Sequence, residues 1–273
     1  MKILICVKQV PDTTEIRIDP VTNSLIRAGV PSILNPFDGY ALEAAARIRD
    51  KHPDTEIIVV SMGPEQASAA LRDCLSIAAD RAYLVCGRIF SGSDTLATSY
   101  ILSQAIRKIE EREGKIDAIF CGKQAIDGDT AQVGPEIAEH LGYPQVTYGL
   151  EAEVEGTELQ VRRETESGYE IVAAKMPCLV TFTKPVWEVR YPTIAQKLEA
   201  EKAEIIMLEE DAFPEIDRSA IGLAGSPTRV KKTFVPQRNK QCKMISGETG
   251  EEIARTLLDL LEERTAPGTE AAV

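Results

Sequence analysis

The stretch DAIFCGKQAIDGDTAQVGPEIAEHLG, residues 117–142, decides the fold. Its apolar start, Asp117–Cys121, is typical of a strand buried on both faces, and a helix follows that ends near Leu141. The loop between them contains Gly122 and Gly128, which permit a close backbone approach or a positive φ. A buried strand, a glycine-containing loop and a helix, in this order, form the repeating unit of α/β folds.

The same alternation of strand and helix occupies the chain before this stretch. Residues 12–34 are predicted to be irregular, with turns at Asp19-Pro20 and Asn23-Ser24. The other predicted elements are a strand at Ile3–Val7, a helix from Asn35-Pro36, a strand at Glu56–Met62, a helix from Gly63-Pro64 to near Asp80, a strand at Ala82–Cys86 and a helix from Asp94 to about Arg112. Strands that alternate with helices pair in parallel. We therefore predict that residues 1–145 form an open, mostly parallel sheet with helices on both faces.

The pattern changes after Pro144, and residues 146–183 read as a β-meander. Turns at Glu155-Gly156 and Ser167-Gly168 separate three strand-like runs, and Cys178–Thr183 makes a fourth. The sequence leaves open whether these strands extend the first sheet or form a layer of their own.

A short helix at about Thr193–Glu201 and an apolar run at Ile205–Leu208 complete a predicted domain of residues 1–208. Residues 209–273 are predicted to form an arm that embraces a partner, followed by an amphipathic helix. The arm, 209–247, has little periodicity, and so long a segment is usually functional or bound to something. Its basic residues are Arg229, Lys231, Lys232, Arg238, Lys240 and Lys243. The helix carries apolar residues at helical spacing, namely Ile253, Leu257, Leu258 and Leu261.

The composition excludes several classes of function. The chain has 273 residues, and its 43 acidic residues exceed its 31 basic ones, which gives a formal net charge of -12. This balance argues against binding to nucleic acid or to an anionic membrane surface. There is no run of the roughly 18 apolar residues that a membrane helix needs, and the first apolar run is too short for a signal peptide. The six cysteines form no C-x-x-C pair, so we expect a reducing compartment such as the cytoplasm and no zinc site.

The loop Gly122–Gly134 is the strongest candidate for a binding site. We expect Thr130 or Asp129 to cap the following helix, so that its first N–H groups point outward and bind phosphate. The pattern is neither G-x-G-x-x-G nor a Walker loop, and a capped turn without a ligand explains it about as well. Three other segments should line the same crevice at the carboxyl ends of the strands: Cys6–Gln9, Asn35–Asp38 and Met62-Gly63. For Asn35 and Asp38, ordinary helix capping is slightly the better explanation.

No Ser–His–Asp set, paired glycosidase-like carboxylates or metal-ligand cluster accompanies these segments. The residues therefore indicate that the chain holds a nucleotide rather than performs side-chain chemistry.

Four separated motifs resemble the β subunit of electron transfer flavoprotein. They are Val7–Thr13 (VKQVPDT), Asn35–Asp38, Gly122–Gly134 and Val161–Thr181, and they occur in the same order. The last includes a stretch similar to that subunit's signature, with Arg163, Glu166, Glu170, Pro177 and Cys178-Leu179-Val180-Thr181. The resemblance runs from the first strand to about residue 235. It implies an α/β fold of the adenine-nucleotide-binding type and a heterodimer with an α subunit that carries FAD.

The resemblance also assigns residues. The cofactor is expected to contact Cys6, Asn35, Pro36, Phe37, Asp38, Met62, Gly122, Lys123, Gln124, Ala125, Ile126, Asp127, Gly128, Asp129, Thr130, Ala131, Gln132 and Val133. A loop at Tyr191–Lys202, centred on Ile194, is expected to recognise a downstream dehydrogenase through Tyr191, Ile194, Lys197 and Lys202. An ordinary solvated helix is the alternative for that loop.

The family has two branches, one with a structural AMP in this site and one with a second FAD that bifurcates electrons. The AMP branch tends to have bulkier or more polar residues where Thr130, Ala131 and Val133 stand here, so this chain resembles the bifurcating branch. That branch takes a hydride from NADH. It sends one electron through the α-subunit FAD to an acyl-CoA, enoyl-CoA or lactate-type dehydrogenase and the other to ferredoxin or flavodoxin.

Two alternatives stay open at this point. One is a non-bifurcating electron carrier with AMP in the site. The other, of a different class, is a nucleotide-binding regulatory or structural α/β protein.

Overall fold

A computed structural model describes residues 1–12, 31–231 and 244–265. The predicted turns at Asp19-Pro20 and Asn23-Ser24, and four basic residues of the predicted arm, Lys232, Arg238, Lys240 and Lys243, lie outside the described residues. The chain divides into two units, Met1–Thr233 and Phe234–Val273. A functional division of the chain at residue 208 stays a prediction.

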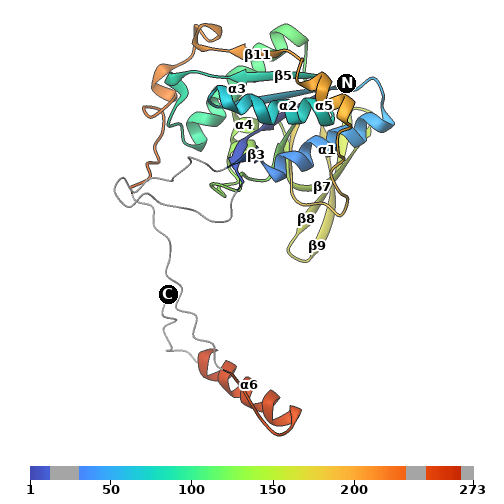
Figure 1. Ribbon diagram of the computed structural model, residues 1–273, viewed down its shortest axis with the longest axis vertical. Helices are drawn as coiled ribbons and strands as arrows, with labels where there is room; N and C mark the ends of the chain where they lie inside the picture. The colour runs from blue at the N-terminus through green and yellow to red at the C-terminus, as the bar shows by residue number, and fades with distance from the viewer. Residues whose placement is uncertain (13–30, 232–243, 266–273) are drawn as a thin grey trace. The chain divides into compact units, whose positions relative to one another are not determined.

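The first unit is built on one nine-stranded sheet with the strand order β11-β5-β4-β1-β6-β10-β7-β8-β9 (Figure 1). All pairs from β11 to β7 are parallel, and only β7-β8 and β8-β9 are antiparallel. The strands are β1 Lys2–Val7, β4 Glu56–Met62, β5 Arg81–Val85, β6 Ala118–Gly122, β7 Gln145–Glu155, β8 Glu158–Thr165, β9 Gly168–Lys175, β10 Cys178–Phe182 and β11 Ile205–Leu208. A separate two-stranded ribbon pairs β2 Gln9–Pro11 with β3 Ser32–Leu34. The prediction of an open, mostly parallel α/β sheet is confirmed.

Helices cover both faces of this sheet because the side chains of each buried strand alternate between two apolar cores. In β1, Ile3 and Ile5 point into one core and Leu4 and Cys6 into the other. The first core is covered by α1 Pro36–Lys51 and α2 Ser68–Ile77, and the second by α3 Thr95–Glu113 and α4 Val133–Leu141. A further helix, α5 Ile194–Ala200, packs on α2.

The order of the strands reverses beside β1. The chain adds β4 and then β5 on one side of β1, and α3 then carries it back to β6 on the other side. Crossovers that diverge in this way leave a crevice at the carboxyl ends of the two central strands, which is where ligands of such sheets bind.

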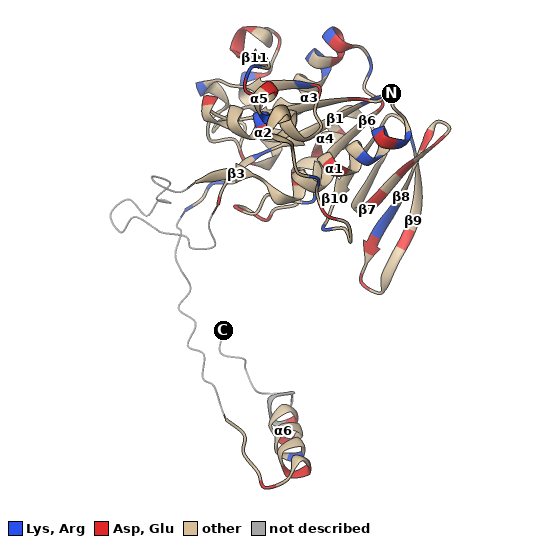
Figure 2. Cartoon of the chain, turned by 45° about the vertical axis from the view of Figure 1, so that its right-hand side comes forward, with Lys and Arg blue, Asp and Glu red and all other residues tan. Residues whose placement is uncertain are grey.

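The meander extends the first sheet, which answers the question that the sequence left open. β10 lies between β6 and β7, so the strand that comes last in the meander joins the other three to the sheet. β8 and β9 project beyond the helices as a hairpin, visible in Figure 2 with charged residues along it. In this hairpin, Arg163 pairs with its register partner Glu170 at 3.0 Å and also donates to the carbonyl of Thr147.

Three expected helix boundaries differ from the structure. The helix expected from Gly63 to Asp80 is a 3-10 turn, Glu65–Ala67, followed by α2, which ends at Ile77. The helix after β6 begins only at Val133, with Gln132 as its N-cap residue and no side-chain cap. Short 3-10 turns also occur at Arg88–Phe90, Glu210–Ala212 and Arg218–Ala220.

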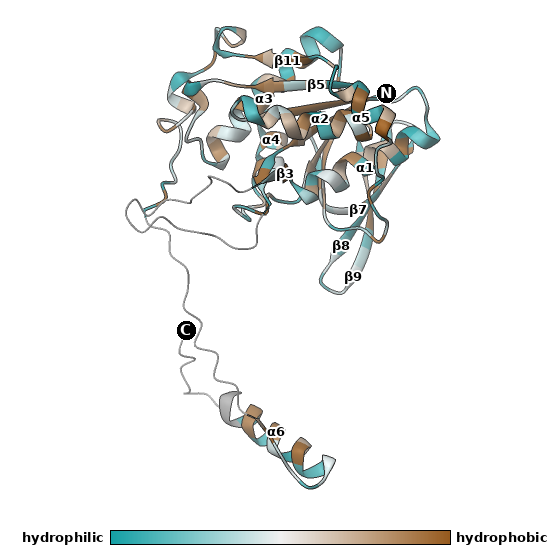
Figure 3. Ribbon diagram, in the orientation of Figure 1, coloured by the Kyte–Doolittle hydropathy of each residue, from teal (hydrophilic) through white to brown (hydrophobic). Residues whose placement is uncertain are grey.

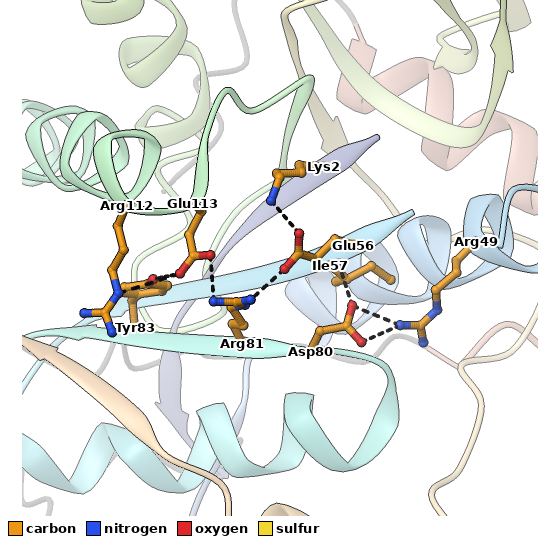
Figure 4. A network of polar contacts seen from close by, with 9 residues as sticks. All are labelled: Lys2, Arg49, Glu56, Ile57, Asp80, Arg81, Tyr83, Arg112 and Glu113. Atoms are coloured by element: carbon orange, nitrogen blue, oxygen red, sulfur yellow. Dashed lines mark hydrogen bonds and ion pairs between the residues drawn. The ribbon is translucent and has the colours of Figure 1, made fainter. Parts of the chain in front are cut away.

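The amino-terminal edge of the sheet, opposite the crevice, is held by a network of ion pairs (Figure 4). Glu56 pairs with Lys2 and with Arg81, and Arg81 reaches on to Glu113 at 2.8 Å. The carboxylate of Glu113 is buried and also accepts a hydrogen bond from the hydroxyl of Tyr83. These ion pairs stabilise the fold at the amino-terminal ends of the strands. The crevice lies at the carboxyl ends, away from them.

The second unit contains α6 Gly250–Thr265. Its apolar residues Ile253, Leu257 and Leu258 are exposed. Figure 3 shows hydrophobic stretches of α6 in brown, alternating with hydrophilic ones. The predicted C-terminal amphipathic helix is therefore confirmed.

Candidate functional site

A cavity of about 360 Å³ lies in the crevice between the carboxyl ends of β1 and β6. Nine residues of the predicted cofactor set line it: Cys6, Asp38, Met62, Gly122, Lys123, Ala125, Gly128, Thr130 and Val133. The other nine are not part of the lining: Asn35, Pro36, Phe37, Gln124, Ile126, Asp127, Asp129, Ala131 and Gln132. Several of these instead hold the lining residues in place.

Asn35 and Asp38 fasten the wall of the cavity rather than cap α1. The buried amide of Asn35 donates to the carbonyl of Gln124 at 2.9 Å and accepts from the backbone of Ile126 at 3.2 Å. As N-cap residue of α1, Asn35 makes no side-chain capping bond, so the interpretation as ordinary caps is wrong for it. The first turn of α1 thereby fixes the loop that follows β6.

The carboxylate of Asp38 joins the two central strands at their ends. It accepts hydrogen bonds from the backbone N–H groups of Lys8, at 2.7 Å, and of Gly122, at 3.1 Å. Burial raises the pKa of Asp38 to about 7, although these hydrogen bonds lower it. A carboxyl group that lines the cavity is thus poised to change charge near neutral pH.

The two glycines of the loop serve different purposes. A Cβ atom on Gly122 would lie 2.7 Å from the carbonyl carbon of Phe37 and 2.8 Å from the nitrogen of Asp38, so β6 and α1 approach closely only because this residue is glycine. A Cβ atom on Gly128 would have nothing within 4 Å, and the φ of Gly128 is not positive. The expected close approach is therefore confirmed at Gly122, whereas the chain itself does not require glycine at position 128.

The loop ends in strained backbone and an uncapped helix. Asp129 and Ala131 have positive φ angles of 52° and 54°, which cost non-glycine residues of the order of 1 kcal/mol each. Asp129 accepts a hydrogen bond from the side chain of Gln124 at 2.6 Å, and neither it nor Thr130 caps α4, contrary to prediction. Because Val133 and Gly134 line the cavity, the uncapped N-terminus of α4 faces it. This arrangement attracts an anion through its N–H groups and the helix dipole.

Two lysines bring positive charge to the same wall. Lys8, at the end of β1, forms an ion pair with Asp127 of the loop at 2.7 Å. The ammonium group of Lys123 lies 5.8 Å from the ring centre of Phe37 and 5.3 Å from that of Tyr148. Cation–π contacts of this kind hold a lysine in place without neutralising its charge.

Sequence reasoning missed the wall that α3 contributes. Ser93, Asp94, Thr95, Thr98 and Leu102 line the cavity. Asp94 is the N-cap residue of α3, where its carboxylate accepts from the backbone of Ala97, and it also accepts from the backbone of Thr228 at 2.9 Å. The order of the strands could have indicated this wall. A helix that crosses from one half of the sheet to the other must begin near the crevice, where the strand order reverses.

The cavity fits a nucleotide. Its apolar floor of Cys6, Cys121 and Leu102 suits a planar ring, and the uncapped α4 suits a phosphate. A second cavity of about 780 Å³ at the ends of β4 and β5 shares the lining residues Met62 and Ser93 with the first, so the two cavities are neighbours. Among the described residues, no group of three or more His, Cys, Asp or Glu side chains could hold a metal ion.

A second feature lies at the predicted partner loop. Tyr191 and Ile194 are 91% and 81% exposed, although both are apolar, and Lys197 and Lys202 lie on the same short segment. Thr193 caps the N-terminus of α5 in a capping box with Gln196. An exposed apolar surface on an ordered helix is typical of a protein contact site.

Arginines hold both ends of this segment. Before it, Arg190 donates to both oxygens of the buried Glu43 and to Asp50. In its last part, the carbonyls of Ala200 and Glu201 accept hydrogen bonds from Arg72 of α2 at 2.7 and 2.9 Å. The segment is thus presented in a fixed conformation, which lowers the entropy cost of binding.

Comparisons with known proteins point to one family. Residues 22–212 match the electron transfer flavoprotein domain. The chain is 50% identical to the electron transfer flavoprotein subunit beta of Megasphaera elsdenii, over 93% of this chain and 94% of that protein. It is 45% identical to the caffeyl-CoA reductase-Etf complex subunit CarD of Acetobacterium woodii, over 97% and 99%, and 48% identical to the protein FixA of Azorhizobium caulinodans, over 90% and 88%. Among the described residues, no helix is long and apolar enough to cross a membrane.

Proposed function

Because this chain belongs to the family of electron transfer flavoprotein β subunits, we propose that it holds FAD in the switch-point cavity and takes part in electron bifurcation. NADH is the proposed electron donor, and ferredoxin or flavodoxin is the proposed acceptor at low potential. The other proposed acceptor is a partner dehydrogenase, reached through the FAD of an α subunit. When bound, the flavin supplies the hydride and one-electron chemistry.

The observation that carries the proposal is the cavity at the ends of β1 and β6, with an uncapped helix at one side and an apolar floor. The N–H groups of Val133 and Gly134, together with Lys8 and Lys123, would hold phosphate groups. Asp38, through its bonds to Lys8 and Gly122, keeps the two strand ends at a fixed separation. The protein's own task is therefore binding, orientation and electrostatics.

Two features favour FAD over AMP. Thr130, Ala131 and Val133 are smaller or less polar than the residues that the AMP branch tends to have at these positions, and Thr130 and Val133 line the cavity. A second cavity of about 780 Å³ also lies next to the first, at Met62 and Ser93, and a cofactor longer than a mononucleotide could use that space.

The proposed partners follow from the surfaces and from the relatives. Tyr191, Ile194, Lys197 and Lys202 are proposed to contact the dehydrogenase. One relative's name joins a CoA-thioester reductase to its Etf complex, which favours an acyl-CoA or enoyl-CoA dehydrogenase over a lactate-type one. The described cysteines are free thiols, which favours work in the cytoplasm.

The test is the cofactor content of the purified complex of this chain with its α subunit. Two FAD per heterodimer are expected. One FAD and one AMP would replace the proposal with a non-bifurcating carrier. A chain that is stable without an α subunit and holds no flavin would favour the regulatory alternative. If two FAD are found, ferredoxin reduction by NADH should require the dehydrogenase and its substrate as second acceptor.

A further inference from the structure

The floor of the cavity contains two thiols on neighbouring strands. Cys6 of β1 and Cys121 of β6 are register partners, so their Cα atoms lie directly opposite one another. Both side chains point to the same face of the sheet, both line the cavity, and they are 8% and 4% exposed. The Cys6 thiol is close enough to Cys121 to raise the pKa of the Cys121 thiol.

We infer that Cys6 and Cys121 form a dithiol site that binds a trivalent arsenical across both sulfurs, and that a bound nucleotide covers this site. The second half of the inference rests on the proposed function. The first half rests only on the placement of the two thiols.

The geometry places the two thiols within reach of one bridging atom. Adjacent strands are separated by about 4.8 Å, and Cys6 and Cys121 are register partners that point to the same face. Both strands lie inside the sheet, between β4 and β10, so the backbone holds the two thiols side by side. An arsenic atom placed between the sulfurs spans a wider separation than an S–S bond.

The chemistry also suits a thiol that stays protonated. The neighbouring Cys6 thiol, burial and the nearby Asp38 raise the pKa of the Cys121 thiol, which makes it a poor nucleophile toward alkylating reagents. An arsenoxide condenses with two neutral thiols. Two S–As bonds form, two S–H bonds and the bonds from arsenic to its oxygen break, and one water leaves. No oxidant or reductant is needed, because arsenic and sulfur keep their oxidation states.

The remaining described cysteines provide matched controls. Cys178 is a buried strand residue like Cys121, but it belongs to the opposite apolar core. Cys86 is the most exposed described cysteine and lines the second cavity. Burial raises the pKa of both thiols, and no second thiol contributes to either shift.

The experiment treats the full chain, freed of nucleotide, with phenylarsine oxide and counts adducts by intact-mass spectrometry. We expect one adduct per chain. This adduct should survive an excess of a monothiol and be removed by a dithiol. Cys6→Ala and Cys121→Ala should each lose it, whereas Cys178→Ala and Cys86→Ala should keep it. Thermal melting shows that each variant is folded, and peptide mapping of the wild-type adduct gives the same answer if one variant does not fold.

An adduct that persists in both Cys6→Ala and Cys121→Ala, or one that monothiol removes, would overturn the dithiol site. FAD or AMP at saturating concentration should slow adduct formation at least tenfold. Adduct formation at an unchanged rate would overturn the covering of the thiols by nucleotide. A separate measurement of FAD and AMP binding then shows whether the proposed function has failed as well.

Discussion

Arg190 forms a bidentate ion pair with Glu43: its Nε donates to one carboxylate oxygen at 2.8 Å and its Nη2 donates to the other at 3.0 Å. Glu43 lies in the middle of α1 with its side chain only 4% exposed, so the pair joins the partner-loop segment to the helix that frames the cavity. Breaking a buried pair leaves an uncompensated charge, which costs more than the pair itself contributes.

Arg190→Gln should therefore lower the free energy of unfolding by ~3 kcal/mol, the low end for a buried pair because Arg190 is partly exposed. It should also raise the hydrogen-exchange rate of the α5 amides. Urea unfolding and hydrogen-exchange mass spectrometry check the two effects. The matched control is Lys51→Gln, which removes an exposed pair with Glu153 and should cost under about 1 kcal/mol. Equal losses in the two variants would contradict the assigned role of Arg190.

The loop glycines allow a sharper test of the site. Gly122→Ala should reduce stability by about 1–3 kcal/mol, because the new Cβ atom meets the backbone of α1. Gly128→Ala should be neutral, since that direction is open. Gly128→Trp should eliminate nucleotide binding while the unfolding free energy stays close to that of the wild type. Equilibrium dialysis with FAD and AMP measures binding, and normal retention of flavin by Gly128→Trp would refute the phosphate-loop assignment.

The raised pKa of Asp38 predicts that its contribution to the stability of the fold decreases as the pH rises. Its pKa is raised from 3.8 to about 7 in the folded chain, so the folded state holds a proton that the unfolded state has lost. This contribution to stability is fully present below about pH 4 and is lost as the pH rises toward 7.

Asp38→Asn cannot titrate, so the stability of the wild type relative to this variant should fall between about pH 4 and pH 7. Because a shift of one pKa unit corresponds to about 1.36 kcal/mol, this fall in relative stability is at most about 4 kcal/mol. Urea unfolding of both proteins at several pH values gives the difference directly. A constant difference across this range would show that Asp38 stays ionised.

The network at the opposite edge should affect stability alone. Glu113→Gln removes the charge that pairs with Arg81, and it should lower the unfolding free energy by about 2–3 kcal/mol. Flavin content should not change, because Glu113 lies at the amino-terminal edge of the sheet, away from the cavity. Absorbance of the bound flavin and denaturant unfolding separate the two properties. A loss of flavin in the folded variant would mean that the two edges are coupled.

Much of the fold could be predicted because buried parallel strands leave a strong pattern. Ile3–Val7 and Glu56–Met62 are largely apolar runs, and the structure places both as neighbours inside the parallel part of the sheet. The position of β10 could not be predicted, because nothing in Cys178–Phe182 states which strands lie on either side of it. Strand order depends on long-range packing rather than on local periodicity.

The site residues that lie at the end of a single strand could be predicted from the sequence. Cys6, Met62 and Gly122 come at strand ends and line the cavity as expected. The roles of Asn35 and of the loop acids were not predictable, since a side chain next to a helix start looks the same whether it caps that helix or binds a distant loop. Only the three-dimensional register of α1 against β6 shows that Asn35 reaches Gln124 and Ile126.

The late position of β10 bears on how the chain is made. β10 pairs with β6, a strand that leaves the ribosome about 60 residues earlier, and β7 can join the sheet only through β10. Until Phe182 has been synthesised, the nascent chain therefore exposes one side of β6 as an unpaired edge, which is a template for aggregation. Pairing over so long a sequence separation is slow, so shielding of this edge by a chaperone during translation should raise the yield of folded chain more than shielding after release.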